Sequence, residues 1–195
     1  LQDVPAAYRT QINDVLLTAL SRALHQWTGE PRVLIDLEGH GREDINARID
    51  LSHTVGWFTS LFPLALDGRG TYAEGLTRVK EDLRSLPNKG VGFGAFKYYG
   101  SQEQKDTLAL LPAAQVVFNY LGQMDNSFNE ASLWQPAEEK TGNATALSTP
   151  LSHAVSINGG ILGGELTLEI SYHSDDFNQA TVEFFGSLFT KELQE

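Results

Sequence analysis

The segment between Ile12 and Trp27 constrains the fold most, because its apolar residues recur at the spacing of an amphipathic helix. The apolar stripe consists of Ile12, Val15, Leu16, Ala19, Leu20, Ala23, Leu24 and Trp27. Gly29 can cap this helix at its C-terminus, and Pro31 follows where a helix could not continue. The sequence therefore predicts a long amphipathic helix that ends near Gly29.

A buried strand is expected directly after this helix. Residues 33–37 are short, apolar and partly β-branched, and they lead into a polar, glycine-flanked turn at residues 38–43. The apolar residues 55–66 predict a second strand that is bent or interrupted near Pro63. Because a loop at the end of a rigid strand exposes its side chains, the turn at 38–43 is a candidate place for reactive groups.

The second half of the chain also contains strand patterns. Residues 115–120 predict a strand, and the long polar stretch from there to about Thr149 is expected to be a mobile loop. Residues 154–157 and 165–172 predict a hairpin around the turn residues 158–160. One face of the second hairpin strand carries Leu166, Leu168, Ile170 and Tyr172.

Two further helices have clear start signals. Thr71 and Glu74 have capping-box spacing, and Pro87 stops the run that they begin. Its core-facing stripe is Tyr72, Leu76, Val79, Leu83 and Leu86. Asn178 is a candidate N-cap for the last helix. The stripe of that helix is Val182, Phe185, Leu188 and Phe189.

The glycines of residues 90–94 do not form a nucleotide loop. They follow a helix and Pro87, and they lack both a preceding strand and the full dinucleotide fingerprint. Three closely spaced glycines are instead typical of tight turns or of close backbone approach.

Composition narrows the class of protein. With 195 residues, 41% of them hydrophobic, the chain can bury a core. A formal net charge of -11 disfavours nucleic acid as a partner. Every apolar run is shorter than the roughly 20 residues that span a bilayer, so no membrane contact is expected. Residues 1–8 lack an initiator Met and a signal-peptide pattern, which indicates a fragment.

Two residue types limit the chemistry. The chain has no Cys, which excludes disulfides and thiolate chemistry and fits a cytoplasmic location. Its five His residues are scattered, with no pair at metal-ligand spacing on one helical face. We therefore expect no structural metal.

Five segments, in order, match the signature motifs of one family. They are YRTQINDVLL at 8–17, EGHGRE at 38–43, TVGWFTS at 54–60, PNKGVGFG at 87–94 and FNYLGQ at 118–123. In these motifs the chain resembles the epimerization domains of nonribosomal peptide synthetases, members of the condensation-domain superfamily. Two positions differ from the usual pattern: Phe93 stands where Tyr is common, and His53 stands where Arg is usual.

The resemblance implies an α/β fold: a chloramphenicol-acetyltransferase-like two-layer sandwich lobe, with a mixed, mostly antiparallel sheet and helices on one face. It identifies residues 1–195 as the C-terminal lobe of an epimerization or condensation-type domain. The His-His-x-x-x-Asp-Gly motif of the N-terminal lobe is absent from this sequence. With the N-terminal lobe missing, we expect the isolated lobe to be inactive.

The resemblance also implies an activity and its partners. A carrier protein would present an L-aminoacyl or peptidyl thioester on its phosphopantetheine arm, and the enzyme, an isomerase, would invert the α-carbon to D. The domain itself would bind no cofactor. The expected setting is bacterial assembly of a secondary metabolite such as an antibiotic, in the cytoplasm.

Glu38 is the candidate catalytic residue. By resemblance it is one acid/base group, and the second His of the absent motif is the other; burial should raise the pKa of Glu38 toward the working range. From the residues alone, a loop carboxylate paired with Arg42 is the simpler interpretation. Arg42 and Glu43 are expected to brace the loop, and His40 to pack in it.

Asn119 and Tyr120 are candidate substrate-positioning residues. Either could donate a hydrogen bond to the thioester oxygen or position Glu38, and simple packing at the strand end is the alternative. Trp57, Phe58 and Phe62 are expected to be core residues, as aromatic side chains in an apolar strand usually are.

Two other functions remain open at this stage. One is the equivalent lobe of a condensation domain that forms amide bonds, although such domains usually lack the motif around Glu38. The other is a non-catalytic module that docks carrier proteins.

Overall fold

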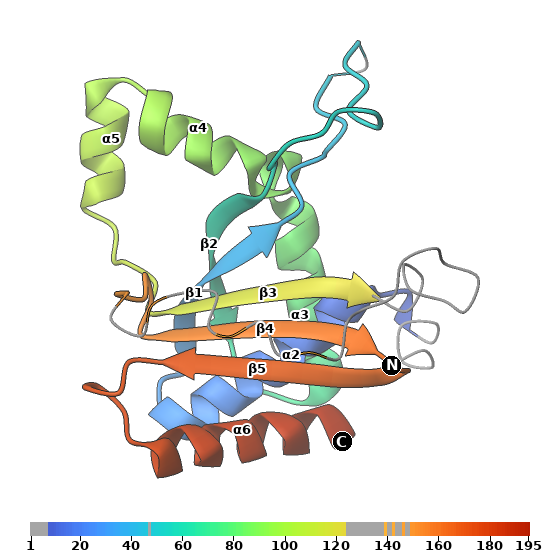
Figure 1. The fold of residues 1–195 in the computed structure, drawn as a ribbon, viewed down its shortest axis with the longest axis vertical. Helices are drawn as coiled ribbons and strands as arrows, with labels where there is room; N and C mark the ends of the chain where they lie inside the picture. Colours follow the sequence, from blue (N-terminus) through green and yellow to red (C-terminus); the bar gives the residue numbers. More distant parts are fainter. Residues whose placement is uncertain (1–7, 47, 124–138, 140–141, 143–145, 147–148) are drawn as a thin grey trace.

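The computed structural model describes residues 8–46, 48–123, 139, 142, 146 and 149–195. A five-stranded sheet in the order β2-β1-β3-β4-β5 forms its centre (Figure 1). The strands are β1 (Arg32–Gly39), β2 (Ser60–Asp67), β3 (Val116–Gln123), β4 (Val155–Leu162) and β5 (Glu165–Tyr172). β3 pairs in parallel with both of its neighbours, β1 and β4. The two outer pairs, β1 with β2 and β4 with β5, are antiparallel. The sheet is therefore mixed, as predicted.

Three helices cover one face of this sheet. They are α2 (Ile12–Thr28), α3 (Tyr72–Ser85) and α6 (Gln179–Gln194). Their buried side chains join those of alternate strand residues in one hydrophobic core, in which Phe118, Phe185 and Phe189 are fully buried. This two-layer α/β arrangement confirms the fold class that the sequence predicted.

The structure confirms the predicted capping residues of α2, α3 and α6. Gly29 ends α2 with φ of 77°, and its N–H donates to the His25 carbonyl. The Thr71 side chain accepts from the Glu74 N–H at the start of α3, and the Asn178 side chain accepts from the N–H of Thr181 at the start of α6. These capping bonds satisfy backbone groups that would otherwise lack a partner.

The first two strands differ from their predicted limits. β1 continues through Glu38 and Gly39, so Glu38 belongs to the strand rather than to a turn after it. β2 begins only at Ser60, so the prediction of a strand over residues 55–59 is wrong. β2 is not interrupted at Pro63, which lies inside this edge strand, the place in a sheet where proline is tolerated.

The predicted C-terminal hairpin exists, but its turn lies elsewhere. β4 continues through Asn158 and Gly159, and the chain reverses at Gly163 and Gly164, which have φ of 62° and 77°. The four apolar residues of β5 share one face, because their partners in β4 are alternate residues from Val155 to Ile161. The loop expected to run to about Thr149 falls mostly outside the described residues.

The glycine-rich segment forms helices instead of the predicted turns. It contains η1 (Pro87–Gly90) and α4 (Val91–Tyr99), and α5 (Gln102–Ala109) follows; the sequence patterns did not identify these helices. The prediction of close backbone approach is confirmed only for Gly90 among the three glycines. Gly90 has φ of 84°, and a Cβ there would lie 2.2 Å from the Phe62 ring. Neither α4 nor α5 contains a buried residue, and both project beyond the sheet (Figure 1).

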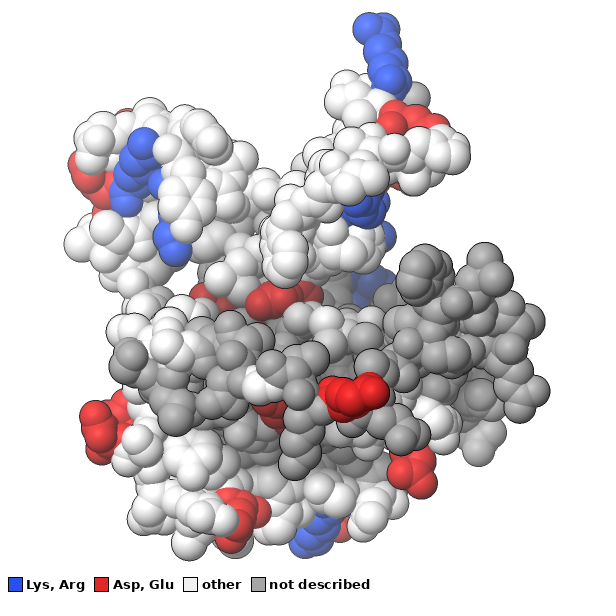
Figure 2. Space-filling model, in the orientation of Figure 1, with Lys and Arg blue, Asp and Glu red and all other residues white. Residues whose placement is uncertain are grey.

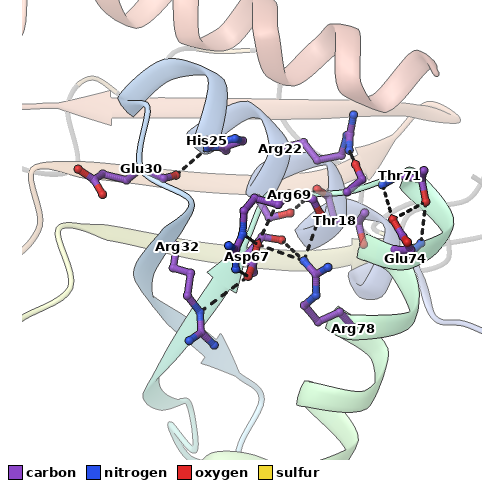
Figure 3. A network of polar contacts seen from close by, with 12 residues as sticks. Thr18, Arg22, His25, Glu30, Arg32, Asp67, Arg69, Thr71, Glu74 and Arg78 are labelled. Atoms are coloured by element: carbon purple, nitrogen blue, oxygen red, sulfur yellow. Dashed lines mark hydrogen bonds and ion pairs between the residues drawn. The ribbon is translucent and has the colours of Figure 1, made fainter.

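A cluster of arginines holds the end of β2. Figure 3 shows Arg69, Arg78 and Arg32 around the Asp67 carboxylate, which is almost completely buried. The nearest nitrogens lie 2.6, 3.2 and 3.9 Å from its oxygens, respectively. Arg69, which donates to Asp67 through its side chain and its backbone N–H, holds the pKa of that carboxyl well below its usual value.

Within the described part of the chain, no helix is long and apolar enough to cross a membrane.

Candidate functional site

Strand alternation places Glu38 on the face of the sheet opposite the helices. Ile35 and Leu37 are buried in the core, so Asp36 and Glu38 point the other way. Leu37 of β1 pairs with Phe118 of the parallel strand β3. Glu38 and Asn119 are the next residues on these neighbouring strands, so the fold brings them to the same edge and the same face.

The two predicted positioning residues separate in the structure. Asn119 pairs with Asn158 of β4 and is half-buried on the face that carries Glu38. Tyr120 pairs with Gly159 and packs against the hydrophobic core on the helix side, and burial raises the pKa of its hydroxyl. Only Asn119 therefore shares a face with the candidate catalytic carboxylate.

The Glu38 carboxyl lies in a partly desolvated position. Burial raises its pKa above the ordinary value of a glutamic acid, and the charge of His153 opposes part of that rise. Glu38 also borders a pocket of about 260 Å³ at the end of β1. The polar and charged residues around this pocket are Gln11, Asn13, Asp14, His40, Glu43, Arg84 and Lys89.

A second pocket lies over Asp36, on the face of the sheet opposite the helices. Its volume is about 310 Å³, and Phe58, Phe93, Lys97 and Tyr98 contribute to its walls. Figure 2 shows acidic side chains at the bottom of a hollow between the body and the parts that project from it. A carboxylate floor with aromatic walls and one nearby cation can hold a polar group within an apolar channel.

Arg42 braces its own loop and does not pair with Glu38. Its guanidinium donates to the carbonyl oxygens of Leu51 and Gly56, at 2.9 and 3.3 Å, and lies 4.2 Å from the centre of the Phe58 ring. These contacts join both ends of the segment between β1 and β2. The simpler interpretation from the residues alone, an Arg42 partner for Glu38, is wrong.

Glu43 connects that loop to η1, directly before α4. Its nearly buried carboxylate lies 2.6 Å from Lys89 Nζ and 3.1 Å from His40 Nε2. Lys89 has φ of 51°, which few non-glycine residues adopt. Gly41 is required nearby, since it has φ of 66° and a Cβ there would lie 1.6 Å from the Phe58 carbonyl oxygen. Sequence patterns did not single out Lys89 as a partner of Glu43.

The aromatic residues of this region divide between core and surface. Phe62 is buried as expected. Trp57 is 90% exposed, so the expectation that it belongs to the core is wrong. The reason is that residues 55–59 form no strand; Phe58 and Thr59 border the pocket over Asp36 instead.

His153 was missed by the sequence patterns. It precedes β4, and its Nε2 lies 2.9 Å from Asp36 Oδ2. A lone histidine in an unpatterned stretch gives no sequence signal, because its partner Asp36 is on a strand more than a hundred residues away. Among the described residues, no group of three or more His, Asp or Glu side chains is arranged to hold a metal ion.

Comparison with known proteins shows the family of this chain. Residues 1–195 match the Condensation domain family, so the chain belongs to that family. A linear gramicidin synthase of Brevibacillus parabrevis is 41% identical over 198 residues, covering 100% of this chain and 2% of that protein. Surfactin synthase subunit 1 of Bacillus subtilis is 42% identical over 192 residues, covering 97% and 5%. These relatives belong to nonribosomal peptide synthetases, and the chain spans only a small part of each.

Solved structures agree with this assignment. The epimerization domain from the third module of tyrocidine synthetase B superposes with a TM-score of 0.88 at 31% identity, covering 99% of this chain and 43% of that one. The first condensation domain of the CDA synthetase, at 16% identity and a TM-score of 0.61, shares the fold; the match covers 98% of this chain and 40% of that one.

Proposed function

We propose that this chain is the C-terminal lobe of an epimerization domain of a peptide synthetase and that Glu38 is one of its two acid/base residues. The observation that carries this proposal is the position of Glu38: a half-buried carboxyl near the end of a central strand, with its pKa raised by burial. A carboxylate with a raised pKa is a better base at neutral pH than an ordinary one. Its rigid strand fixes it relative to a bound substrate.

The reaction needs one proton removed from the α-carbon and one returned to its opposite face. Glu38 would take or return the proton on one face, and a residue of the N-terminal lobe would serve the other. The negative charge that develops on the thioester oxygen needs a hydrogen-bond donor. Asn119, on the same face as Glu38, can supply its side-chain amide, while Tyr120 supports the end of β3 from the core side.

The substrate would be an aminoacyl or peptidyl thioester on the phosphopantetheine of a carrier protein, which is the partner that we propose. The domain would bind no cofactor of its own. Arg42 and Glu43 would keep the loop after β1 in place through their contacts with Leu51, Gly56 and Lys89. The proposed setting is a bacterial synthetase in the cytoplasm, and the chain's lack of Cys is compatible with it.

The test measures exchange of the α-proton with deuterated water in the complete domain, supplied with a carrier protein that bears an L-aminoacyl thioester. Glu38→Gln should slow exchange and D-product formation by about 100- to 10,000-fold, the usual contribution of a general base. Glu183→Gln is the matched control, because this α6 residue is exposed and its carboxylate accepts a hydrogen bond from its helix neighbour Gln179. Unchanged exchange in Glu38→Gln would refute the role of Glu38.

Amide formation is the second candidate, since the matched family is named for condensation. A wild-type domain that exchanges no α-proton but joins a donor and an acceptor thioester would establish it. A folded domain that binds the carrier protein and performs neither reaction would instead be a docking module.

A further inference from the structure

We infer that His153 is a positioning residue of the candidate site, which fixes Asp36 on the face of the sheet that carries Glu38 and so sets the electrostatic surroundings of the Glu38 carboxyl. This inference rests on the proposed function of Glu38. It assigns a role to a residue that none of the family motifs identified in the sequence contains.

The imidazole of His153 is held at both nitrogens. Nε2 lies 2.9 Å from Asp36 Oδ2, and Nδ1 lies 2.9 Å from Ser152 Oγ. The His153 side chain is only 8% exposed, and that of Asp36 is 20% exposed. A ring with two polar partners and little contact with solvent keeps one orientation, so the imidazole remains at a fixed place.

This contact bridges strands on the face that carries Glu38. Val155, two residues after His153, pairs with Val116 of β3, which in turn pairs with Ile35 of β1. His153 therefore reaches across β3 to Asp36, two residues before Glu38 on the same face of β1. The link brings an imidazole from a distant part of the sequence to the face of β1 that carries Glu38.

Several other titratable or charged groups lie around Glu38. Some of those described are paired with other residues, and the rest line the two pockets or the neighbouring strand. Glu43 binds Lys89 and His40, and Arg84 donates to the Arg9 carbonyl. The remaining titratable neighbours border the two pockets or the adjoining strand: Asp14, Lys97 and Tyr120. His153 is the group whose charge opposes the effect of burial on Glu38.

The sign of the effect follows from this charge. A protonated His153 stabilises the carboxylate of Glu38, so its removal leaves burial unopposed and raises the pKa of Glu38 further. A base works only when ionised, so the pH at which exchange begins to rise should move upward. His153→Gln keeps a group able to bond Asp36 and removes the charge.

The experiment records the pH profile of α-proton exchange in the complete domain with its loaded carrier protein. We expect His153→Gln to slow exchange about threefold to tenfold on the acidic limb, with nearly wild-type rates on the alkaline plateau. His173→Gln is the control, because this histidine bonds the Leu151 carbonyl and should leave the profile unchanged. A uniform loss at every pH, or no change at all, would overturn the inference.

A second readout separates this inference from the proposed function. The Glu38 carboxyl can be titrated by ¹³C NMR in wild type and His153→Gln, with Glu38→Gln used to assign its resonance. A titration that moves to higher pH in His153→Gln supports the inference even if the domain epimerizes nothing, and an unchanged titration overturns it even if the domain is active. His153→Asn provides the same comparison if the Gln variant does not fold.

Discussion

The body and the projecting region of this molecule use similar apolar residues in opposite ways. In the body, α2, α3 and α6 bury their stripes against the sheet, and Phe118 is fully buried. In the projecting region, defined as residues 40–46 and 48–59 with α4 and α5, neither helix contains a fully buried residue, and Tyr99 is 91% exposed. Apolar composition alone therefore does not identify the core. An apolar side chain is buried only where another element, here the sheet, packs against it. Glu38 lies where the two regions meet.

The largest expected difference is between a core aromatic and a projecting one. Phe118→Ala should lower the free energy of unfolding by about 3–5 kcal/mol, since it removes a large buried side chain and leaves a cavity. Tyr99→Ala should change it by less than about 0.5 kcal/mol. Denaturant unfolding followed by circular dichroism measures both. A loss from Tyr99→Ala as large as that from Phe118→Ala would show that the projecting region packs in solution.

The next effect concerns the buried polar network between α2, α3 and α6. Glu192 accepts from Arg22 Nε at 2.6 Å and from the Tyr72 hydroxyl at 2.7 Å. Glu192→Ala should cost about 2–3 kcal/mol, because it removes the buried carboxylate that accepts from Arg22, Tyr72 and Gln26. Glu183→Ala, on the exposed side of the same helix, should cost less than about 0.5 kcal/mol. Equal unfolding curves for the two variants would contradict a stabilising network.

A smaller, pH-dependent effect is expected at the end of β2. Arg69 lowers the pKa of Asp67 in the folded protein, so this carboxylate stabilises the fold above the pKa of an unfolded Asp, about 4. That stability is lost as the pH falls from about 4 through the lower pKa of the folded state. Asp67→Asn should lower stability at pH 7 and make thermal stability depend less on pH below about 4. A steeper acid dependence in Asp67→Asn than in wild type would disprove this sign.

The smallest effect on stability should come from the contact between the two regions. Lys89 is 72% exposed, so Lys89→Met should change the free energy of unfolding by less than about 1 kcal/mol. The Glu43 loop beside Glu38 would lose its tether, and we expect exchange of the α-proton to fall about tenfold or more. The control is Lys105→Met on α5, which should alter neither quantity. Normal exchange in Lys89→Met would show that the loop needs no such tether.

The body was predictable from the sequence, and the projecting region was not. Periodic apolar residues and caps such as Gly29, Thr71 and Asn178 are local signals, so α2, α3 and α6 were found with nearly correct limits. The helix α4 has glycines at 92 and 94 and no buried face, so neither propensity nor periodicity identified it. Trp57 was misplaced for the same reason, because nothing local distinguishes an exposed aromatic from a buried one.

The candidate site was only partly visible in the sequence. Motifs identified Glu38, Asn119 and Tyr120, but the register of β1 and β3 decides that Asn119 and not Tyr120 shares the face of Glu38. The partners Lys89 of Glu43 and His153 of Asp36 lie far away along the chain. Such pairs depend on the tertiary fold, which residue spacing does not encode.

The parallel pairing at the centre of the sheet also sets an order of events during folding. β1 with β2 and β4 with β5 are neighbours along the chain, so each pair can form with little loop-closure entropy. β1 joins β3 only after a long intervening segment has been closed, which is slow. Until then both central strands have open edges that could pair with another chain. Pulse-labelled hydrogen exchange should show amide protection in the outer pairs before β3, and the site of Glu38 would be completed last.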